Sequence, residues 1–390
     1  SKPIYLTVTD PRREGRKGSY VTYLISSSTA RTSIELAENA VRRRYSDFTW
    51  LHQVLMDRYS QCVLPPLPDK YRLKYISGSR FSPEFLEKRR RALERFLQGI
   101  VRHPVLQRHE ATKLFLTEEA LSPHKAKFTL MGPDRSETMM ESLSDSLSHA
   151  FSKAPKPDRR FIAIGEGCNR LEEDLHEVDK LTSRLALYGR ELEREYDTFG
   201  RGMQELGQLE PTMAGPLRVF GETVRSFAET LKTKSTFEEE VYLAEIREMM
   251  RYSQRLRDVL SLREEKQRDH EEIKALLIQQ EKEKVRLEQG SGAGMGIVGA
   301  LKDRLDEAKG RDMERLRRAR LEKTNKRVQD LREAVRESGE ISRLFSREVV
   351  HEAELFEKGK RNDLKHTLGG YVGAQVDFYR QGLEMWEEVI

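Results

Sequence analysis

The chain has 390 residues, 35% of them charged, with a net charge of +5 and two cysteines, Cys62 and Cys168. This length allows two domains with cores of their own, and the excess of charge indicates long exposed helices. Two distant cysteines exclude a disulfide framework and indicate a reducing, intracellular setting. No apolar run approaches the roughly twenty residues that span a bilayer, and no signal peptide is visible. Because the chain begins at Ser1 without a methionine, we expect its leading segment to be missing.

The front of the chain is basic. Residues 1–120 contain 22 Lys and Arg against 13 Asp and Glu, a net charge of +9, whereas residues 121–390 have a net charge of −4. This asymmetry predicts an anionic partner for the front part.

Residues 1–120 have the pattern of a compact α+β unit. Alternating apolar residues predict strands around Ile4–Val8 and Val21–Ile25, and a third strand is expected from about Ile34 to Arg42. Ser46 is expected to cap a first helix, and Ser82, followed by proline, to begin a second one.

The junction of the third strand and the first helix carries the most informative motif, Arg42-Arg43-Arg44-Tyr45-Ser46-Asp47-Phe48. Arginine holds a phosphate through two parallel donors, and a tyrosine ring can pack against the face of a sugar-like ring. The motif therefore fits a phosphorylated cyclic polyol. A solvated basic strand end or a nuclear-localisation run has the same composition and stays open at this point.

Two later segments of the front part also carry signals. The proline segment Leu64–Lys70 cannot form a regular helix, and it offers the PxxP spacing of an SH3 ligand. It leads into lysines and aromatic residues that suit either a membrane interface or ordinary packing. In the basic run Lys88–Arg91, Arg89 lies four residues after Phe85 and is expected to point inward, where it would need an anion. Its neighbours are expected to be solvated.

Residues 121–160 have the composition of a linker. Within it an apolar stripe at nearly helical spacing consists of Met139, Met140, Leu143, Leu147 and Phe151. The stripe fits equally an amphipathic helix on a membrane and a helix that packs on the following domain.

From Phe161 onward the chain is expected to be almost entirely helical. Apolar residues from Ile164 to Leu206 recur at three- and four-residue steps, which predicts a heptad-like seam. A second helix is expected from near Leu217 to Gln289 and a third from near Leu301 to Val389. A helix of about 75 residues is roughly 110 Å long. No compact monomer encloses such a helix, so we expect the seams to find a partner.

Signals for catalysis are poor, and we expect no enzyme, no metal and no cofactor. Gly294–Gly299 matches a dinucleotide-binding fingerprint literally, but charged helical residues precede it instead of a buried strand. A flexible turn between two helices, whose Ile297 and Val298 could touch lipid, is the preferred interpretation. The segment Arg304–Arg332 is dense in arginine and lysine. It fits either a solvated helix face or a basic face apposed to anionic lipid.

Several segments then line up in one order: Arg-Arg-Tyr-Ser-Asp-Phe, Leu-Pro-Pro-Leu-Pro-Asp-Lys, Phe-Leu-Glu-Lys-Arg-Arg-Arg-Ala-Leu-Glu-Arg-Phe and His103-Pro104. This set resembles a phox-homology (PX) domain, and the helical remainder resembles a BAR domain. Together they resemble a PX-BAR sorting nexin, most similar to the fungal sorting nexin-four subfamily of endosomal recycling and selective autophagy. The resemblance implies an α+β PX domain with a three-stranded sheet at 1–120, a linker at 121–160 and an elongated all-α three-helix BAR domain at 161–390.

The resemblance also implies a ligand, phosphatidylinositol 3-phosphate, and a role for each residue of its pocket. Arg44 would hold the 3-phosphate, and Tyr45 would pack under the inositol ring. Lys70 would meet the 1-phosphate, Arg89 would bind the hydroxyls at positions 4 and 5, and Arg43 would add charge at the rim.

The family implies a non-enzymatic peripheral membrane protein on the cytosolic face of endosomes, with pre-autophagosomal sites as a second location. It would sense or shape curvature as a homodimer, or as a heterodimer with another sorting nexin. The alternative is a coiled-coil scaffold whose basic front domain binds protein or nucleic acid.

Overall fold

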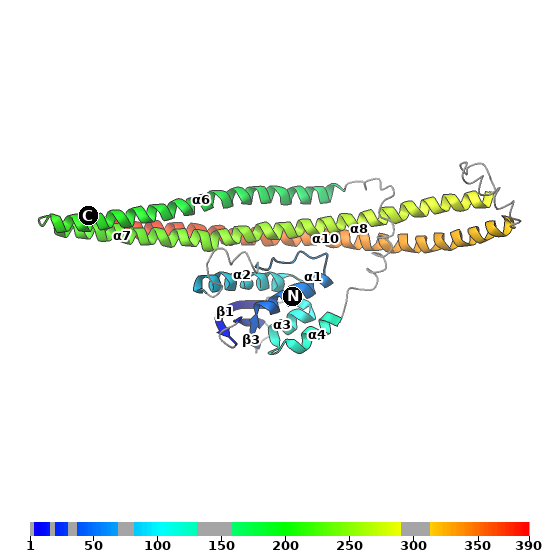
Figure 1. Ribbon diagram of the computed structural model, residues 1–390, viewed down its shortest axis with the longest axis horizontal. Coiled ribbons are helices and arrows are strands. Elements are labelled where there is room, and N and C mark those ends of the chain that lie inside the picture. Colours follow the sequence, from blue (N-terminus) through cyan, green and yellow to red (C-terminus); the bar gives the residue numbers. More distant parts are fainter. Residues whose placement is uncertain are drawn as a thin grey trace. The chain divides into compact units, whose positions relative to one another are not determined.

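A computed structural model of the chain describes residues 4–15, 20–29, 37–68, 82–130, 158–289 and 313–389 (Figure 1). These parts group into two compact units. The first unit takes in Ser1–Gly132, Ala163–Asp258 and Glu352–Ile390, and the second takes in Pro133–Ile162 and Val259–His351. None of the described helices combines the length and apolar character that a membrane span requires.

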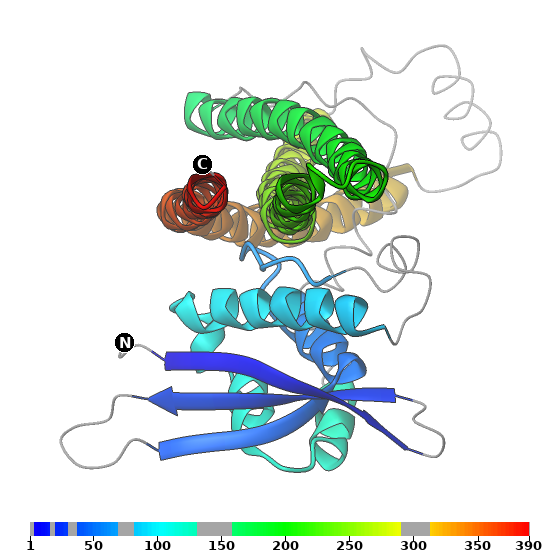
Figure 2. The same ribbon diagram turned by 90° about the vertical axis from the view of Figure 1, so that its left-hand side faces the viewer.

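The N-terminal part of the first unit is built on a three-stranded antiparallel sheet, as the alternating pattern predicts. The strands are β1 (Ile4–Glu14), β2 (Tyr20–Thr29) and β3 (Ala37–Arg44), in the order β1-β2-β3. Figure 2 shows the three strands side by side beneath a helix. Val8 pairs with Ile25, which pairs with Val41, and all three side chains are buried on one face.

The helices of this part are α1 (Tyr45–Arg58), α2 (Pro83–Arg102), α3 (Glu110–Thr117), α4 (Ser122–Leu130) and the short 3₁₀ turn η3 (Leu106–Arg108). The hydroxyl of Ser82 accepts a hydrogen bond from the Phe85 amide, which confirms the predicted start of α2. The start of α1 differs from the prediction. Arg44 is its N-cap, and Asp47 accepts the Arg44 N–H at 2.7 Å, so Ser46 does not cap the helix.

One hydrophobic core holds the sheet and these helices together. Phe48, Phe96 and Phe115 are fully buried, and the rings of Phe48 and Phe115 meet edge-on with centroids 5.1 Å apart. The proline segment packs against α2, because a Cβ at Gly99 would lie 2.4 Å from Cγ of Pro65. The three prolines of this segment are buried, so it presents no exposed SH3 ligand in this structure.

The remaining helices are α6 (Arg159–Leu209), α7 (Ala214–Phe237), α8 (Leu243–Gln289) and α10 (Met313–Glu387). A π-helical turn, Glu238–Tyr242, joins α7 to α8 without a break, so the described part of this region forms three long helices, as predicted. In the first unit Leu175 of α6 packs with Tyr242, Ile246 and Met249.

In the second unit α8 and α10 run side by side (Figure 1). Polar contacts join them at several levels, including a bond of 3.0 Å from Arg263 Nε to Ser346 Oγ and an ion pair of 2.7 Å between Arg332 and Glu281. Three expectations lie outside the described residues: Lys70, the stripe from Met139 to Phe151 and the turn Gly294–Gly299.

Candidate functional site

Tyr45 and Arg89 meet in the first unit, one from the start of α1 and the other from α2. The guanidinium carbon of Arg89 lies 4.8 Å from the centroid of the Tyr45 ring and 4.4 Å from that of Phe85. Such distances give a cation–π attraction with each ring. The structure therefore confirms that Arg89 points to the side of α2 that carries Phe85.

The Arg89 guanidinium retains donor capacity. Its Nε is buried and has no hydrogen-bond acceptor among the described residues. The fully buried Tyr23 lies beside it, and burial raises the pKa of this phenol to about 12, although the nearby Arg89 charge opposes the shift. A buried N–H without a partner costs about 1–3 kcal/mol, which a ligand oxygen would recover. The site is thus prepared for an anion or a hydroxyl group.

The Tyr45 hydroxyl donates a hydrogen bond to the carbonyl of Pro68. This bond holds the end of the proline segment next to the Tyr45 ring. Pro68 lies two positions before Lys70 in the chain. Lys70 itself lies outside the described residues, so its place beside the ring stays a prediction.

Arg44 is the last residue of β3 and is exposed. Its guanidinium carbon lies 5.0 Å from the centroid of the Tyr20 ring. No ion pair with a residue of the described ranges engages the side chain, so its charge is open to a ligand. The structure places Arg44 next to Tyr45 along the chain, but it shows no contact between the guanidinium groups of Arg44 and Arg89.

The expectation that Arg43 adds charge at the rim of the site is wrong. Successive strand residues face opposite sides, so Arg43 points toward the core, away from the Arg44 side. Its side chain is 1% exposed and donates to the carbonyl of Phe115 at 2.9 Å, and to further carbonyls at the end of α3, those of Leu114, Glu118 and Glu119. Arg43 thus satisfies carbonyls that the last turn of α3 leaves free, and burial lowers its pKa.

The other cations of the Lys88–Arg91 run are less solvated than expected. Arg90 donates to the Val8 carbonyl at 2.6 Å and to Glu94 at 2.7 Å, so it joins α2 to the edge strand β1. Lys88 belongs to a basic stripe on α2, with Arg95 and Arg102, at seven-residue spacing. Each of the three pairs with a carboxylate of the long helices in the same unit: Lys88 with Glu240 at 3.0 Å, Arg95 with Glu248 at 2.6 Å and Arg102 with Asp363 at 3.2 Å.

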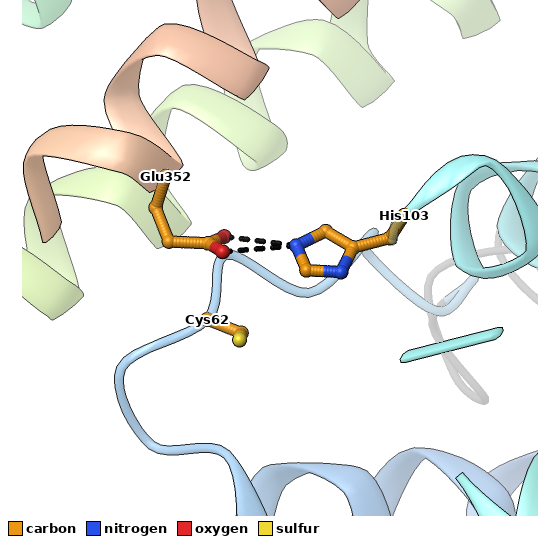
Figure 3. Close-up of side chains that lie close together, drawn as sticks. All are labelled: Cys62, His103 and Glu352. Carbon is orange, nitrogen blue, oxygen red and sulfur yellow. Dashed lines mark hydrogen bonds and ion pairs between the residues drawn. The ribbon is translucent and has the colours of Figure 1, made fainter. Parts of the chain in front are cut away.

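A second cluster consists of Cys62, His103 and Glu352, all buried (Figure 3). His103 Nε2 lies 3.0 Å from Glu352 Oε1, and the ligand atoms of all three residues lie within 4.8 Å of one another. The spacing along the sequence gave no sign of this group, because Glu352 comes from α10. A thiolate, an imidazole and a carboxylate can together hold Zn²⁺.

The hydrogen bonds of His103 argue against a metal at this cluster. The amides of Val105 and Leu106 both donate to Nδ1, each at 3.2 Å, so Nδ1 carries no proton. A neutral imidazole then holds its proton on Nε2, which donates to Glu352. A metal would need the lone pair of Nε2, and metal-bound histidine normally donates through its other nitrogen. The cluster is therefore best described as a buried imidazole–carboxylate pair.

The heptad-like seam of α6 divides into two faces. Its first part, from Cys168 to Val178, packs within the first unit around Leu175. Further along, α6 exposes a set of large apolar side chains, the α6 stripe: Leu181, Leu185, Tyr188, Leu192, Phe199 and Leu206. A matching α10 stripe consists of Leu368, Val372, Val376, Tyr379 and Leu383. Each of these side chains is 42–68% exposed, which is unusual for contiguous apolar surface on a stable monomer.

Comparison with known proteins gives matches along almost the whole chain. Residues 31–119 match the PX domain family, and residues 136–390 match the family described as Vps5 C terminal like. Sorting nexin-4 of Cryptococcus neoformans var. neoformans is 36% identical over 98% of this chain and 79% of its own length. Sorting nexin-4 of Colletotrichum higginsianum is 33% identical over 97% and 81%.

Among solved structures, the cryo-EM structure of the SNX-BAR Mvp1 tetramer superimposes with a TM-score of 0.59. That match covers 98% of this chain and 99% of the Mvp1 chain at 18% identity. At this identity the likeness establishes the fold of the two parts and nothing finer.

Proposed function

The chain belongs to the sorting nexins that join a PX domain to a BAR-type helical domain, and on this premise we propose that it binds phosphatidylinositol 3-phosphate and assembles as a curvature-sensing dimer. Members of this family are non-enzymatic adaptors of membrane trafficking. A PX domain implies a phosphoinositide ligand, and a BAR domain implies dimerisation. The identity of the lipid and of the partner subunit is the proposal.

The observation that carries the lipid proposal is the state of Arg89. Its buried Nε has no acceptor among the described residues, while its guanidinium stands against the Tyr45 ring. An inositol ring lying on Tyr45 would bring hydroxyl oxygens to this donor. Arg89 is accordingly proposed to bind the hydroxyls at positions 4 and 5, and Tyr45 to pack under the ring.

Charge around this centre supports a monophosphorylated head group. Arg44, exposed and next to Tyr45 in the chain, is proposed to hold the 3-phosphate through its two parallel donors. The bond from Tyr45 to Pro68 brings the proline segment to the ring, which supports a role for Lys70 at the 1-phosphate. Arg43 is not part of the proposal, because its donors are occupied by carbonyls.

The dimer proposal rests on the α6 and α10 stripes. Two exposed apolar surfaces in one unit are expected to be covered, and a second copy of the chain carries the same surfaces. A dimer would present two lipid pockets to one membrane, so weak individual attachments would add up to strong binding. Pairing with another sorting nexin would use the same stripes and is distinguished by the mass of the purified chain.

The cellular setting follows the same premise. We propose that the protein works on the cytosolic face of endosomes, in recycling and selective autophagy, since the fungal relatives named sorting nexin-4 match nearly the whole chain. The domain limits remain proposals too, with the PX domain at 1–120, a linker at 121–160 and the BAR domain at 161–390.

Vesicle sedimentation tests the lipid proposal. The full chain should bind vesicles with phosphatidylinositol 3-phosphate and not vesicles with the 4-phosphate isomer at equal charge. Arg44→Ala should lose this binding, whereas the control Arg108→Ala removes an exposed arginine elsewhere in the same domain and should retain it. Equal binding by Arg44→Ala and Arg108→Ala would refute the pocket. Affinity that ignores the lipid and falls steeply with salt would support the nucleic-acid alternative instead.

A further inference from the structure

A basic cavity lies in the second unit, between α8 and α10 and near the start of α6. Its volume is about 680 Å³. The charged side chains in its lining are Arg160, Arg263, Glu271, Arg336, Arg343 and Arg347. Five arginines thus face one carboxylate among the lining residues, which favours an anionic occupant.

Arg263 has the most unusual environment in this cavity. The side chain is 8% exposed, and its guanidinium carbon lies 3.9 Å from the centroid of the Phe161 ring. Its Nε donates to the Ser346 hydroxyl at 3.0 Å, but no carboxylate of the described residues lies within ion-pair distance. Burial lowers the pKa of Arg263. The charges of Asp158 and Glu264 oppose this shift, but neither carboxylate lies within ion-pair distance, so a closer anion would stabilise the buried guanidinium.

Two exposed arginines of the cavity can share such an anion through their terminal nitrogens, since the Nε of Arg343 already donates to the Gly339 carbonyl at 3.0 Å. Arg343 and Arg347 lie one turn apart on α10, are exposed, and have no carboxylate of the described residues within 4 Å. Arg160 and Arg336 already have partners, Asp158 at 2.8 Å and Glu333 at 4.0 Å. Arg263, Arg343 and Arg347 therefore form the centre of the site.

Close contacts hold the part of the cavity wall around His270 in place. His270 Nδ1 lies 3.0 Å from the Ser338 hydroxyl, which fixes the ring. A Cβ at Gly339 would lie 3.0 Å from Cε1 of His270, so a larger residue here would press on the imidazole ring. The hollow is thus shaped by specific contacts and is not a gap between two loosely packed helices.

We propose that this cavity binds a phosphate-bearing anion of head-group size, held by Arg263, Arg343 and Arg347. Guanidinium groups bind phosphates through paired N–H donors, and three of them around one hollow suit a molecule with more than one phosphate. The ligand is either the head group of a membrane lipid or a free inositol phosphate. The site is separate from the PX pocket, so it would give the helical part of the chain an anion preference of its own.

The test uses the full chain carrying Arg44→Ala, so that the PX pocket contributes nothing. One arm measures binding of soluble inositol 1,4,5-trisphosphate by calorimetry. The other measures sedimentation with vesicles containing phosphatidylinositol 4,5-bisphosphate, whose head group is the same chemical unit. The double variant Arg343→Gln/Arg347→Gln should weaken binding at least tenfold in whichever arm shows it. The control Arg327→Gln, an exposed arginine on α10 outside the cavity, should not.

Binding to the soluble ligand alone would identify a free inositol phosphate, and binding to the vesicles alone would identify a lipid; either result supports the proposal. Absence of binding in both arms, or equal affinity of the double variant and Arg327→Gln, would overturn it. Arg263→Met supplies a second measurement: it should weaken ligand binding at least tenfold, with only a modest fall in melting temperature from the lost Ser346 bond and the lost cation–π contact with Phe161. A large fall in melting temperature with ligand binding retained would assign Arg263 a purely structural role.

Discussion

The imidazole of His103 and the carboxylate of Glu352 form a buried pair, 3.0 Å apart, although 249 positions separate them in the chain. The two residues are 7% and 2% exposed. The same carboxylate accepts a hydrogen bond from the Val63 amide at 2.9 Å. One side chain of α10 thus accepts from two donors in the N-terminal part of the first unit. Burial of a charge is tolerated here because both neighbours donate to it.

Glu352→Ala should lower the stability of the chain. Two buried donors, His103 Nε2–H and the Val63 amide, would lose their acceptor, and each unsatisfied donor costs about 1–3 kcal/mol. Urea unfolding should therefore show a loss of about 3 kcal/mol relative to Glu348→Ala, an exposed glutamate one turn away on the same helix. Hydrogen exchange should become faster at the Val63 amide. Equal stability of the two variants would mean that the pair contributes nothing.

Zinc should not stabilise the protein through the cluster of Cys62, His103 and Glu352. The proton on His103 Nε2 blocks the lone pair that a metal requires, because the amides of Val105 and Leu106 occupy Nδ1. The melting temperature should stay unchanged with a stoichiometric amount of Zn²⁺ or with a chelator, and Cys62→Ser should behave as the parent does in both. A rise with Zn²⁺ that Cys62→Ser abolishes would show that the cluster is a metal site.

Substitutions of Arg43 and Arg44 should affect different properties: Arg43→Met should lower stability, and Arg44→Ala should abolish lipid binding. Arg43→Met removes the donor to the buried Phe115 carbonyl and to partly buried carbonyls at the end of α3, and hydrogen bonds to charged groups contribute about 1.5–3 kcal/mol each. We expect a loss of about 3 kcal/mol or more in urea unfolding. Arg44→Ala, at an exposed position, should change stability by less than about 1 kcal/mol and yet abolish binding to the 3-phosphorylated lipid. The reverse pattern would contradict the assignment of the two residues.

Much of the fold follows from local rules that the sequence displays. Alternation predicts the sheet, Ser82 with its following proline predicts the start of α2, and four-residue spacing from Phe85 predicts the inward side of Arg89. The same alternation rule excludes Arg43 and Arg44 from a common site, since neighbours on a strand face opposite sides. Treating the arginine run as one charged patch overlooked this.

The remaining features depend on contacts between distant segments. Glu352 cannot be assigned to His103 from spacing, because the pairing exists only once α10 has packed in the first unit. The apolar pattern of α6 continues in sequence, yet it changes face after Val178. Thr182 and Ala186 continue the buried face of Leu175, whereas Leu181, Leu185 and Tyr188 are 51–62% exposed. A periodic pattern shows that a face is apolar; it does not show which molecule covers the face.

The α6 and α10 stripes should mediate association of two copies. Tyr188→Asp puts a charge in the α6 stripe, where it would be desolvated on pairing, and should weaken the dimer at least tenfold, about 1.4 kcal/mol or more. The control is Leu344→Asp, because Leu344 is 56% exposed on α10 in the second unit, outside both stripes. Sedimentation equilibrium gives the mass, and circular dichroism checks that helix content is kept. A parent chain that stays monomeric at micromolar concentration would reject the homodimer and leave pairing with another sorting nexin.

His52 should make stability depend on pH. Burial, and to a lesser degree the charge of Arg255, lowers the pKa of His52 in the folded chain to about 4, whereas an exposed histidine titrates near 6.5. Below pH 6.5 the unfolded chain therefore takes up a proton that the folded chain does not accept until the pH approaches 4. The folded state loses stability as the pH falls through this interval, by about 2 kcal/mol between pH 7 and pH 5.

Replacement of this histidine isolates its share of the pH dependence. In His52→Gln the side chain no longer titrates, so the loss of stability between pH 7 and pH 5 should be smaller than in the parent by about that same 2 kcal/mol. Urea unfolding at the two pH values measures this difference. The matched control is His124→Gln, in α4 of the N-terminal part of the first unit. His109, whose pKa burial also lowers, leaves a residual slope in both variants. A parent and a His52→Gln variant with equal pH dependence would show that His52 reaches solvent and titrates as it does in the unfolded chain.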